Sequence, residues 1–296
     1  MRVGVVILPE YRWWVAEPKW RAVEEYGFHH AWTYDHLGWR SLVDGPWFGA
    51  MPTLTAAAMV TSQIRLGTLV AKPSYRHPVS FVREVLALDD VSDGRFTLGL
   101  GSGGTGTDRY DVTVFGDKPL SGKENFARYR EFVEAMDGLL RNDQHSYAGD
   151  FYTAVEARNL PGCVQLPRVP FVLAGNGPQA LRLAAKHGAG WVTTGRVTES
   201  LDEWWQVISE LVARFDEYVR AEQRDPNKVD KYLFLDSAPT FSLSSVEYFS
   251  DAVGKAADLG FTDVITHWPR ESGVYAGSES VLEAVADEVL PRLAAR

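Results

Sequence analysis

The chain has 296 residues, of which 45% are hydrophobic and 23% charged, a composition typical of a globular protein with one or two domains. Its formal net charge of −9 and the absence of Lys- or Arg-rich runs argue against nucleic acid or a membrane surface as a partner. Cys163 is the only cysteine, which excludes an internal disulfide and a cysteine metal cluster. This lone cysteine, and an N-terminal run without the features of a signal peptide, lead us to expect a cytoplasmic protein.

Strand-like and helix-like segments alternate along the chain. Short apolar runs predict strands at 3–8, 29–33, 64–71, 95–100, 171–174, 189–194, 232–237 and 262–266. Apolar residues at helical spacing predict helices at 18–26, 51–61, 78–91, 123–141, 178–187, 201–222, 246–259 and 278–293. Residues 146–157 are predicted to form a hairpin around Gly149.

These elements form eight consecutive strand-then-helix pairs, which indicates a parallel sheet connected by right-handed crossovers. We therefore predict an α/β fold, a (β/α)8 TIM barrel with loop insertions, as a single domain over residues 1–296. The alternative is a doubly wound open sheet. That fold usually carries a Gly-rich nucleotide turn after its first strand, where this chain has Pro9-Glu10-Tyr11-Arg12.

The segment 170–191 has the pattern of a complete strand, turn and helix. Its apolar run ends at Gly175-Asn176-Gly177, and Pro178 suits the first turn of the helix. The free N–H groups at such a helix start can bind a phosphate at close range. The alternative is a tight connection that uses Gly and Asn only for their positive φ. The segment alone fits both interpretations.

In a barrel the loops that follow the strands form the active face, so the candidate residues lie at strand ends. His36, after the second strand, is the best acid or base candidate, because histidine exchanges protons near neutral pH. The alternative is a surface-loop histidine that is hydrogen-bonded to its neighbours. His30 lies at a strand start and is predicted to be structural. The strand ends carry no metal-binding spacing, and we expect no metal.

Five segments of this chain together resemble the bacterial luciferase-like flavin and deazaflavin oxidoreductases. They are GFHHAWTYDH (27–36), IRLGTLV with YRHP (64–78), LDDVSDGRFTLGLGSG (88–103), FG (115–116) with the helix that follows, and VQLPRVPFVLAGNGPQALRLAAKHGAGWV (164–192). The resemblance implies a (β/α)8 barrel, a redox cofactor across the carboxyl ends of the strands, and a small-molecule substrate. It also implies a cofactor phosphate at the helix after Gly175-Asn176-Gly177, a bulge or non-proline cis peptide at Leu69-Val70, and a homodimer.

Two cofactors are used in this family: FMN, in enzymes that activate oxygen, and the deazaflavin coenzyme F420, which carries hydride. Asp35-His36 followed by Trp39 resembles the F420-dependent alcohol and sugar-phosphate dehydrogenases. The resemblance therefore implies coenzyme F420, with His36 catalytic, Asp35 orienting His36 or contacting the coenzyme, and Trp39 lining the substrate site. The residues expected to bind the cofactor are Asp35, Leu69, Val70, Lys72, Ser102, Gly103, Gly175, Asn176, Gly177 and Pro178.

One departure concerns the sugar-phosphate dehydrogenases, which carry a catalytic Glu directly after the Gly-x-Gly of the fourth strand. Gly104 stands there in this chain, and Asp108 is our candidate for a catalytic carboxylate from the same loop. Arg270 is the candidate for substrate binding, while the aromatic loops favour an apolar substrate. The expected reaction is hydride transfer on an alcohol, carbonyl or activated alkene. The alternatives are an FMN-dependent monooxygenase, a non-catalytic flavin-binding protein, and a barrel enzyme that acts on a sugar or phosphate ester without redox chemistry.

Overall fold

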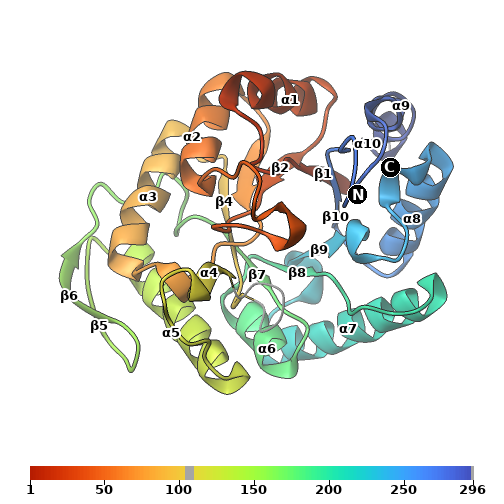
Figure 1. Ribbon diagram of the computed structural model, residues 1–296. Coiled ribbons are helices and arrows are strands. Elements are labelled where there is room, and N and C mark those ends of the chain that lie inside the picture. Colours follow the sequence, from red (N-terminus) through yellow and green to blue (C-terminus); the bar gives the residue numbers. More distant parts are fainter. Residues whose placement is uncertain (104–109, 295–296) are drawn as a thin grey trace. The chain divides into compact units, whose positions relative to one another are not determined.

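The computed structural model describes residues 1–103 and 110–294, and eight of its strands form a closed barrel in the order β1-β10-β9-β8-β7-β4-β3-β2 (Figure 1). These strands are β1 (Arg2–Val6), β2 (His30–Thr33), β3 (Arg65–Thr68), β4 (Phe96–Leu100), β7 (Phe171–Ala174), β8 (Gly190–Thr193), β9 (Asp230–Phe234) and β10 (Asp263–His267). The predicted (β/α)8 TIM barrel is confirmed, and the alternative of an open doubly wound sheet is wrong.

Helices connect the strands as the alternating pattern predicts. They are α1 (Trp13–Glu25), α2 (Ala50–Val60), α3 (Pro78–Val91), α4 (Tyr110–Thr113), α5 (Gly122–Arg141), α6 (Pro178–His187), α7 (Leu201–Ala221), α8 (Val246–Asp258), α9 (Glu279–Glu288) and α10 (Leu290–Ala294). None of the helices in the described part of the chain combines the length and the apolar character needed to cross a membrane.

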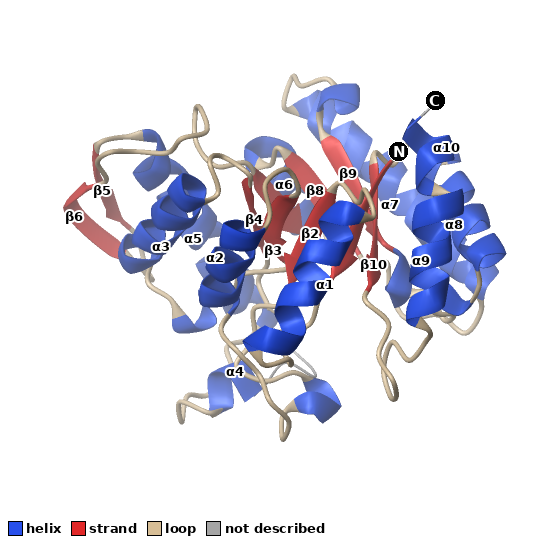
Figure 2. Cartoon of the chain, turned by 90° about the horizontal axis from the view of Figure 1, so that it is seen from above, coloured by secondary structure: helices blue, strands red, loops and turns tan. Residues whose placement is uncertain are grey.

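The chain divides into two compact units by its internal packing, while the single domain expected over residues 1–296 stays a prediction. The first unit comprises Met1–Leu8, Pro18–Trp32 and Val172–Arg296, and the second comprises Pro9–Glu17 and Thr33–Phe171. In the first unit α8 and α9 lie side by side (Figure 2), and Trp191 stacks on Phe215 with ring centroids 4.6 Å apart. In the second, Phe81 of α3 packs against Phe132 of α5.

The barrel strands are mostly buried, as expected of parallel strands with continuous apolar sequences. β4 is buried at every position. A Cβ on Gly99 of β4 would collide with the carbonyl oxygen of Thr68 in β3, so this close approach requires glycine. The Thr68 hydroxyl in turn donates to the Gly99 carbonyl at 2.8 Å. These contacts lock together the two strands whose ends carry Lys72 and Ser102.

A buried ionic network occupies the starts of the strands in the first unit. His30 Nε2 lies 3.0 Å from Asp263 Oδ1, and the indole of Trp32 donates to His30 Nδ1 at 2.6 Å. Arg2 donates to the other Asp263 oxygen at 2.7 Å. Burial alone would raise the pKa of Asp263, but the hydrogen bond and charge of His30, together with Arg2, lower it. His30 therefore has the structural role that the sequence predicts.

Some helix ends differ from their predicted positions. Helix α1 begins at Trp13, five residues before the start predicted at Pro18, and so contains Pro18. Proline lacks an N–H to donate to Trp14, but Trp14 is exposed and its carbonyl can bond water. The single helix predicted at 278–293 is instead α9 and α10, which meet just before Pro291. Proline explains this break as well, since it removes a helical hydrogen bond.

The predicted hairpin is confirmed as β5 (Gln144–Ala148) and β6 (Thr153–Arg158), which lie beside α3 and α5 (Figure 1). The buried carboxylate of Glu131 on α5 accepts hydrogen bonds from the backbone N–H groups of Asp150, Phe151 and Tyr152, at 2.6–3.1 Å. The Tyr152 hydroxyl donates to the Pro73 carbonyl at 3.0 Å. One carboxylate thus holds the hairpin turn, and the hairpin holds the segment that follows β3.

We expect Glu131→Gln to lower the free energy of unfolding by about 1–3 kcal/mol. The hydrogen bonds to a charged carboxylate are lost, and the side-chain NH2 of the glutamine then faces the backbone N–H donors of the hairpin turn. Denaturant unfolding measures the loss, and hydrogen exchange should quicken at residues 150–152. The matched control is Glu217→Gln on the exposed face of α7, which should leave both readouts unchanged. An unchanged stability in Glu131→Gln would contradict this role.

Candidate functional site

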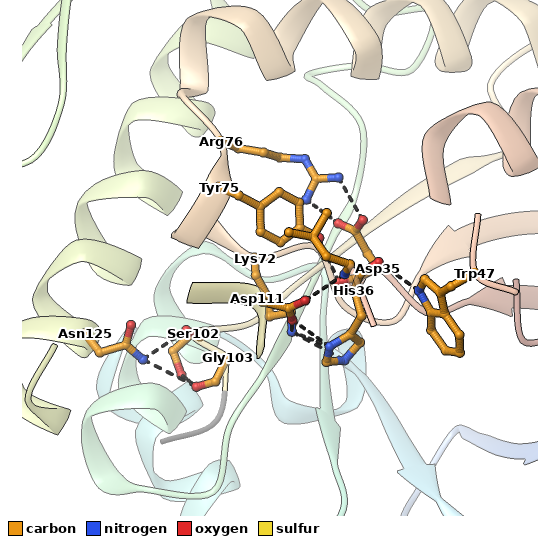
Figure 3. Close-up of polar contacts among 11 residues, drawn as sticks. Asp35, His36, Trp47, Lys72, Tyr75, Arg76, Ser102, Gly103, Asp111 and Asn125 are labelled. Carbon is orange, nitrogen blue, oxygen red and sulfur yellow. Dashed lines mark hydrogen bonds and ion pairs between the residues drawn. The ribbon is translucent and has the colours of Figure 1, made fainter. Parts of the chain in front are cut away.

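A cluster of three polar side chains lies at the ends of β2 and β3 in the second unit (Figure 3). His36 Nδ1 lies 2.7 Å from Asp111 Oδ2 and 2.6 Å from Lys72 Nζ. Lys72 also pairs directly with Asp111, whose second oxygen accepts the backbone N–H of Leu37 at 2.6 Å. Lys72 and Asp111 are buried, and the His36 side chain is 9% exposed. A base, a cation and a carboxylate therefore share one small volume.

The ionisation of Asp111 follows from these partners. Burial disfavours its charged form, but the hydrogen bond with His36 and the positive charge of Lys72 outweigh burial and lower the pKa of Asp111 to about 2. Asp111 is therefore a carboxylate at all physiological pH values. It can only accept hydrogen bonds, which limits what its two neighbours can do.

Acid unfolding should report this carboxylate. Because the folded pKa lies below the ordinary 3.8, Asp111 stabilises the fold above about pH 4, and that contribution is lost as the pH falls through about 2. We expect the difference in unfolding free energy between the parent and Asp111→Asn to shrink by about 2 kcal/mol over this range. Urea unfolding at a series of pH values measures it, and a pH-independent difference would contradict the assignment.

Asp35, which we predicted to orient His36 or to contact the coenzyme, is held by Arg76, and its contact with the coenzyme stays a prediction. Both nitrogens of the Arg76 guanidinium donate to its carboxylate, and Tyr75 donates to its backbone carbonyl at 2.9 Å. Arg76 lies between the rings of Tyr75 and Phe81, at 4.6 and 4.5 Å. Asp35 therefore joins the end of β2 to the segment after β3. Among the described contacts, Asp111 rather than Asp35 binds the His36 ring.

Aromatic residues complete the surroundings of His36. The indole of Trp47 donates to the His36 carbonyl at 2.8 Å, and the Tyr34 ring lies 6.0 Å from the imidazole between centroids. Trp39 is buried and packs edge-on against Tyr34 at 5.1 Å. Trp39 thus contacts a neighbour of His36, and its role in substrate binding stays a prediction.

The Leu69-Val70 peptide bond is cis, as the resemblance implies. Leu69 N–H donates to the Thr33 carbonyl at 2.9 Å, which fixes this bond beside the end of β2. Leu69 is buried, whereas Val70 is partly exposed. Val70 is therefore the member of the pair whose side chain solvent reaches.

The segment after β4 lies against Lys72. Gly103 has φ +74°, and a Cβ there would come within 3.0 Å of Lys72 Cδ. Asn125 of α5 donates to the carbonyls of Ser102 and Gly103 at 3.0 and 3.4 Å. Asp108, our second catalytic candidate, and Gly104 lie outside the described residues. Ser102 and Gly103 are thus fixed beside the lysine stem (Figure 3).

The Gly-rich turn between β7 and α6 belongs to the first unit and is built from hydrogen bonds. Asn176 Oδ1 accepts the Thr193 hydroxyl at 2.7 Å, and its amide donates to the Gly195 carbonyl at 2.5 Å. The Trp191 indole donates to the Gly175 carbonyl at 2.8 Å. Helix α6 starts at Pro178 after Gly177, which provides no side-chain cap. The side chain of Asn176 is therefore committed, while the helix start presents exposed main chain.

Arg270 follows β10 in the first unit. Its Nη1 donates to the carbonyls of Ser272 and Val274 at 2.8 and 3.1 Å, so its guanidinium supports its own loop. Tyr275 from that loop stacks on His267, the last residue of β10. Binding of substrate by Arg270 stays a prediction. In the described part of the chain, three or more His, Cys, Asp or Glu side chains nowhere gather as a metal site would require.

The residue that sequence reasoning missed is Asp111. It comes from the short helix α4, and 75 positions separate it from His36. The only signal was its type, an acidic residue in the segment between the Gly-rich loop and Phe115-Gly116. Such a signal does not distinguish Asp111 from Asp108, which occupies the same stretch.

Known proteins resemble this chain along most of its length. The F420-dependent glucose-6-phosphate dehydrogenase of Beutenbergia cavernae is 29% identical over 92% of this chain and 91% of its own. The F420-dependent hydroxymycolic acid dehydrogenase of Mycobacterium tuberculosis is 28% identical over 88% of this chain and 67% of its own. A solved F420-dependent secondary alcohol dehydrogenase in complex with an F420-acetone adduct has a TM-score of 0.81 at 17% identity, covering 98% of both chains, and so shares the fold. The model of the luciferase-like monooxygenases matches residues 19–238, and the chain therefore belongs to the luciferase-like monooxygenase family.

Proposed function

We propose that this protein is a coenzyme F420-dependent oxidoreductase that transfers hydride to or from a small organic substrate. The observation that carries the proposal is the His36–Lys72–Asp111 cluster at the ends of barrel strands, where the active face of such a barrel lies. The F420-dependent names of the two relatives and the sequence Asp35-His36-Leu37-Gly38-Trp39 support the same coenzyme.

The turn before α6 fits the phosphate of such a coenzyme. Helix α6 has ten residues, and its first N–H groups, at Gln179 and Ala180, have no intrahelical acceptor. A Cβ on Gly177 would meet no atom within 4 Å, so the space above the main chain is open. The N–H groups and the positive end of the helix dipole favour an anion there. We propose that Gly175, Asn176, Gly177 and Pro178 form the phosphate site.

The bound coenzyme would accept or supply the hydride, and the residues of the second unit would handle the proton. His36 can take the hydroxyl proton of an alcohol as its carbon loses hydride, or return that proton to a carbonyl oxygen. Lys72, Ser102, Gly103 and the Leu69-Val70 pair are the residues that we propose contact the coenzyme. The exposed aromatic side chains of Trp14 and Phe48 support an apolar substrate.

A titration tests the coenzyme. We expect the purified protein to quench the fluorescence of oxidised F420 saturably, with FMN binding much more weakly. Tight binding of FMN without a response to F420 would overturn the proposal. That result, with oxygen uptake in the presence of reduced FMN, would instead support our second candidate, an FMN-dependent monooxygenase, which agrees with the monooxygenase named in the family description.

We also propose that the protein is a homodimer. Several apolar side chains of the second unit are strongly exposed, among them Met59, Val155 and Leu166 at 72%, 79% and 89%. Contact with a second copy would remove this apolar surface from water, which is favourable. Light scattering after gel filtration should give twice the mass of 33.0 kDa, and a mass of one chain would refute the dimer.

A further inference from the structure

The contacts of His36 restrict where its proton can be. Asp111 Oδ2 lies 2.7 Å from Nδ1 and, as a carboxylate, can only accept a hydrogen bond. Lys72 Nζ lies 2.6 Å from Nδ1 and 3.4 Å from Nε2. A group in line with an Nδ1–H bond would lie much farther from Nε2 than from Nδ1. Because Lys72 Nζ is close to both ring nitrogens, the ammonium lies beside the ring and not in line with Nδ1–H. The in-plane partner of Nδ1 is therefore Asp111, to which Nδ1–H donates.

The charged groups around His36 favour either the neutral or the protonated form of its ring. Lys72 and Asp111 are the charged groups in described contact with His36, and they come from the segment after β3 and from α4. The nearby carboxylate of Asp35 is already neutralised by Arg76. Lys72 and Asp111 therefore balance each other. A protonated His36 would add a second buried positive charge to one carboxylate, which is unfavourable in a site from which water is largely excluded.

From these contacts we propose that Asp111 and Lys72 are positioning residues that hold His36 neutral with its proton on Nδ1, so that Nε2 receives the proton of a hydroxyl substrate. This rests on the proposed function and extends it to the class of substrate. A neutral Nε2 accepts a hydrogen bond, so the resting site recognises an alcohol O–H. A carbonyl oxygen has no proton to offer it.

The chemical step balances with the coenzyme of the proposed function as oxidant. His36 Nε2 would take the proton as the alcohol O–H bond breaks. The C–H bond of the same carbon would break as well, its hydride would be accepted by the oxidised coenzyme, and the C–O single bond would become a carbonyl. His36 then carries a positive charge between Asp111, which stabilises it, and Lys72, which repels it. That repulsion favours release of the proton to solvent and restores the neutral base.

Nitrogen-15 NMR of labelled histidines tests the proposal on the protein without coenzyme. The signals of His36 are identified as those that disappear from the spectrum of His36→Gln. We expect the parent to show the Nδ1–H tautomer, and Lys72→Met to raise the pH at which His36 becomes doubly protonated by about one unit or more. Lys72→Arg keeps the positive charge and should restore the parent value. Lys231→Met, which removes a buried lysine paired with Asp216, is the matched control and should change neither signal.

The Nε2–H tautomer in the parent, or identical titrations for the parent and Lys72→Met, would overturn the proposal. Should Lys72→Met fail to fold, Lys72→Met with Asp111→Asn removes both charges together and should abolish the preference for Nδ1–H. In alcohol oxidation the acid limb of kcat/KM should move to higher pH in Lys72→Met and return in Lys72→Arg. Since the NMR measurement needs no coenzyme, failure to bind F420 would refute the proposed function and leave this result standing.

Discussion

His36→Gln should lower kcat by about 10²–10⁴-fold, the usual contribution of a positioned acid or base, and leave the affinity for coenzyme F420 unchanged. Glutamine is similar in size and its amide can still meet Asp111, so the cluster stays filled. It cannot take a proton, and the reaction then depends on water. The residual rate should also lose the acid limb of its pH profile.

Steady-state kinetics and F420 titration on the same preparations measure the two effects separately. The matched control is His77→Gln, at the exposed start of α3, where glutamine can replace the imidazole that accepts the Val79 N–H. It should keep the parental kcat. A His36→Gln enzyme with normal kcat and weakened coenzyme binding would make His36 a binding residue and contradict its role in proton transfer.

Gly177→Asp should change stability and coenzyme binding in opposite directions. Gly177 has φ −79° and ψ 155°, which any residue adopts, and its Cβ position is open. An aspartate there would cap α6 and interact favourably with the helix dipole, adding about 0.3–1 kcal/mol to the free energy of unfolding. The same negative charge would occupy the proposed phosphate site, and we expect F420 affinity to fall about tenfold or more, which is ~1.4 kcal/mol per tenfold.

Gly177→Asn separates charge from capping. Asparagine also caps a helix but is neutral, so it should stabilise the fold and weaken F420 binding far less than aspartate does. Thermal unfolding and fluorescence titration of the three proteins give both quantities. Equal affinities for the Asp and Asn variants would show that no anion binds at this helix start.

The positions of the barrel strands were predictable, because parallel strands are buried on both faces and therefore have continuous apolar sequences. Helix α3 and strand β7 have the predicted bounds, since Pro78 and Gly175 mark their ends. The start of α1 was not predictable from Pro18. A proline is favourable in the first helical turn and tolerable a turn later on an exposed face, and the sequence does not say which applies.

Local sequence placed His36, Lys72 and the Gly175–Gly177 turn at strand ends, but it did not predict their partners. Asp35 precedes His36 in the sequence, and the resemblance implied that it orients the ring or contacts the coenzyme. Both residues lie in the segment that follows β2, where Asp35 meets Arg76 and His36 meets Asp111. Pairing between distant loops depends on tertiary packing, which a single sequence does not contain.

The hydrogen bond from Tyr152 to the Pro73 carbonyl has a consequence for laboratory evolution of this enzyme. It joins the surface hairpin β5–β6 to Pro73, the residue next to Lys72, which we propose holds His36 neutral. Libraries of variants restricted to the loops at the strand ends would not include the hairpin residues that make this contact. We expect substitutions in the hairpin turn, which Glu131 anchors, to displace Lys72 and so to change the pH range of turnover without altering His36, Lys72 or Asp111.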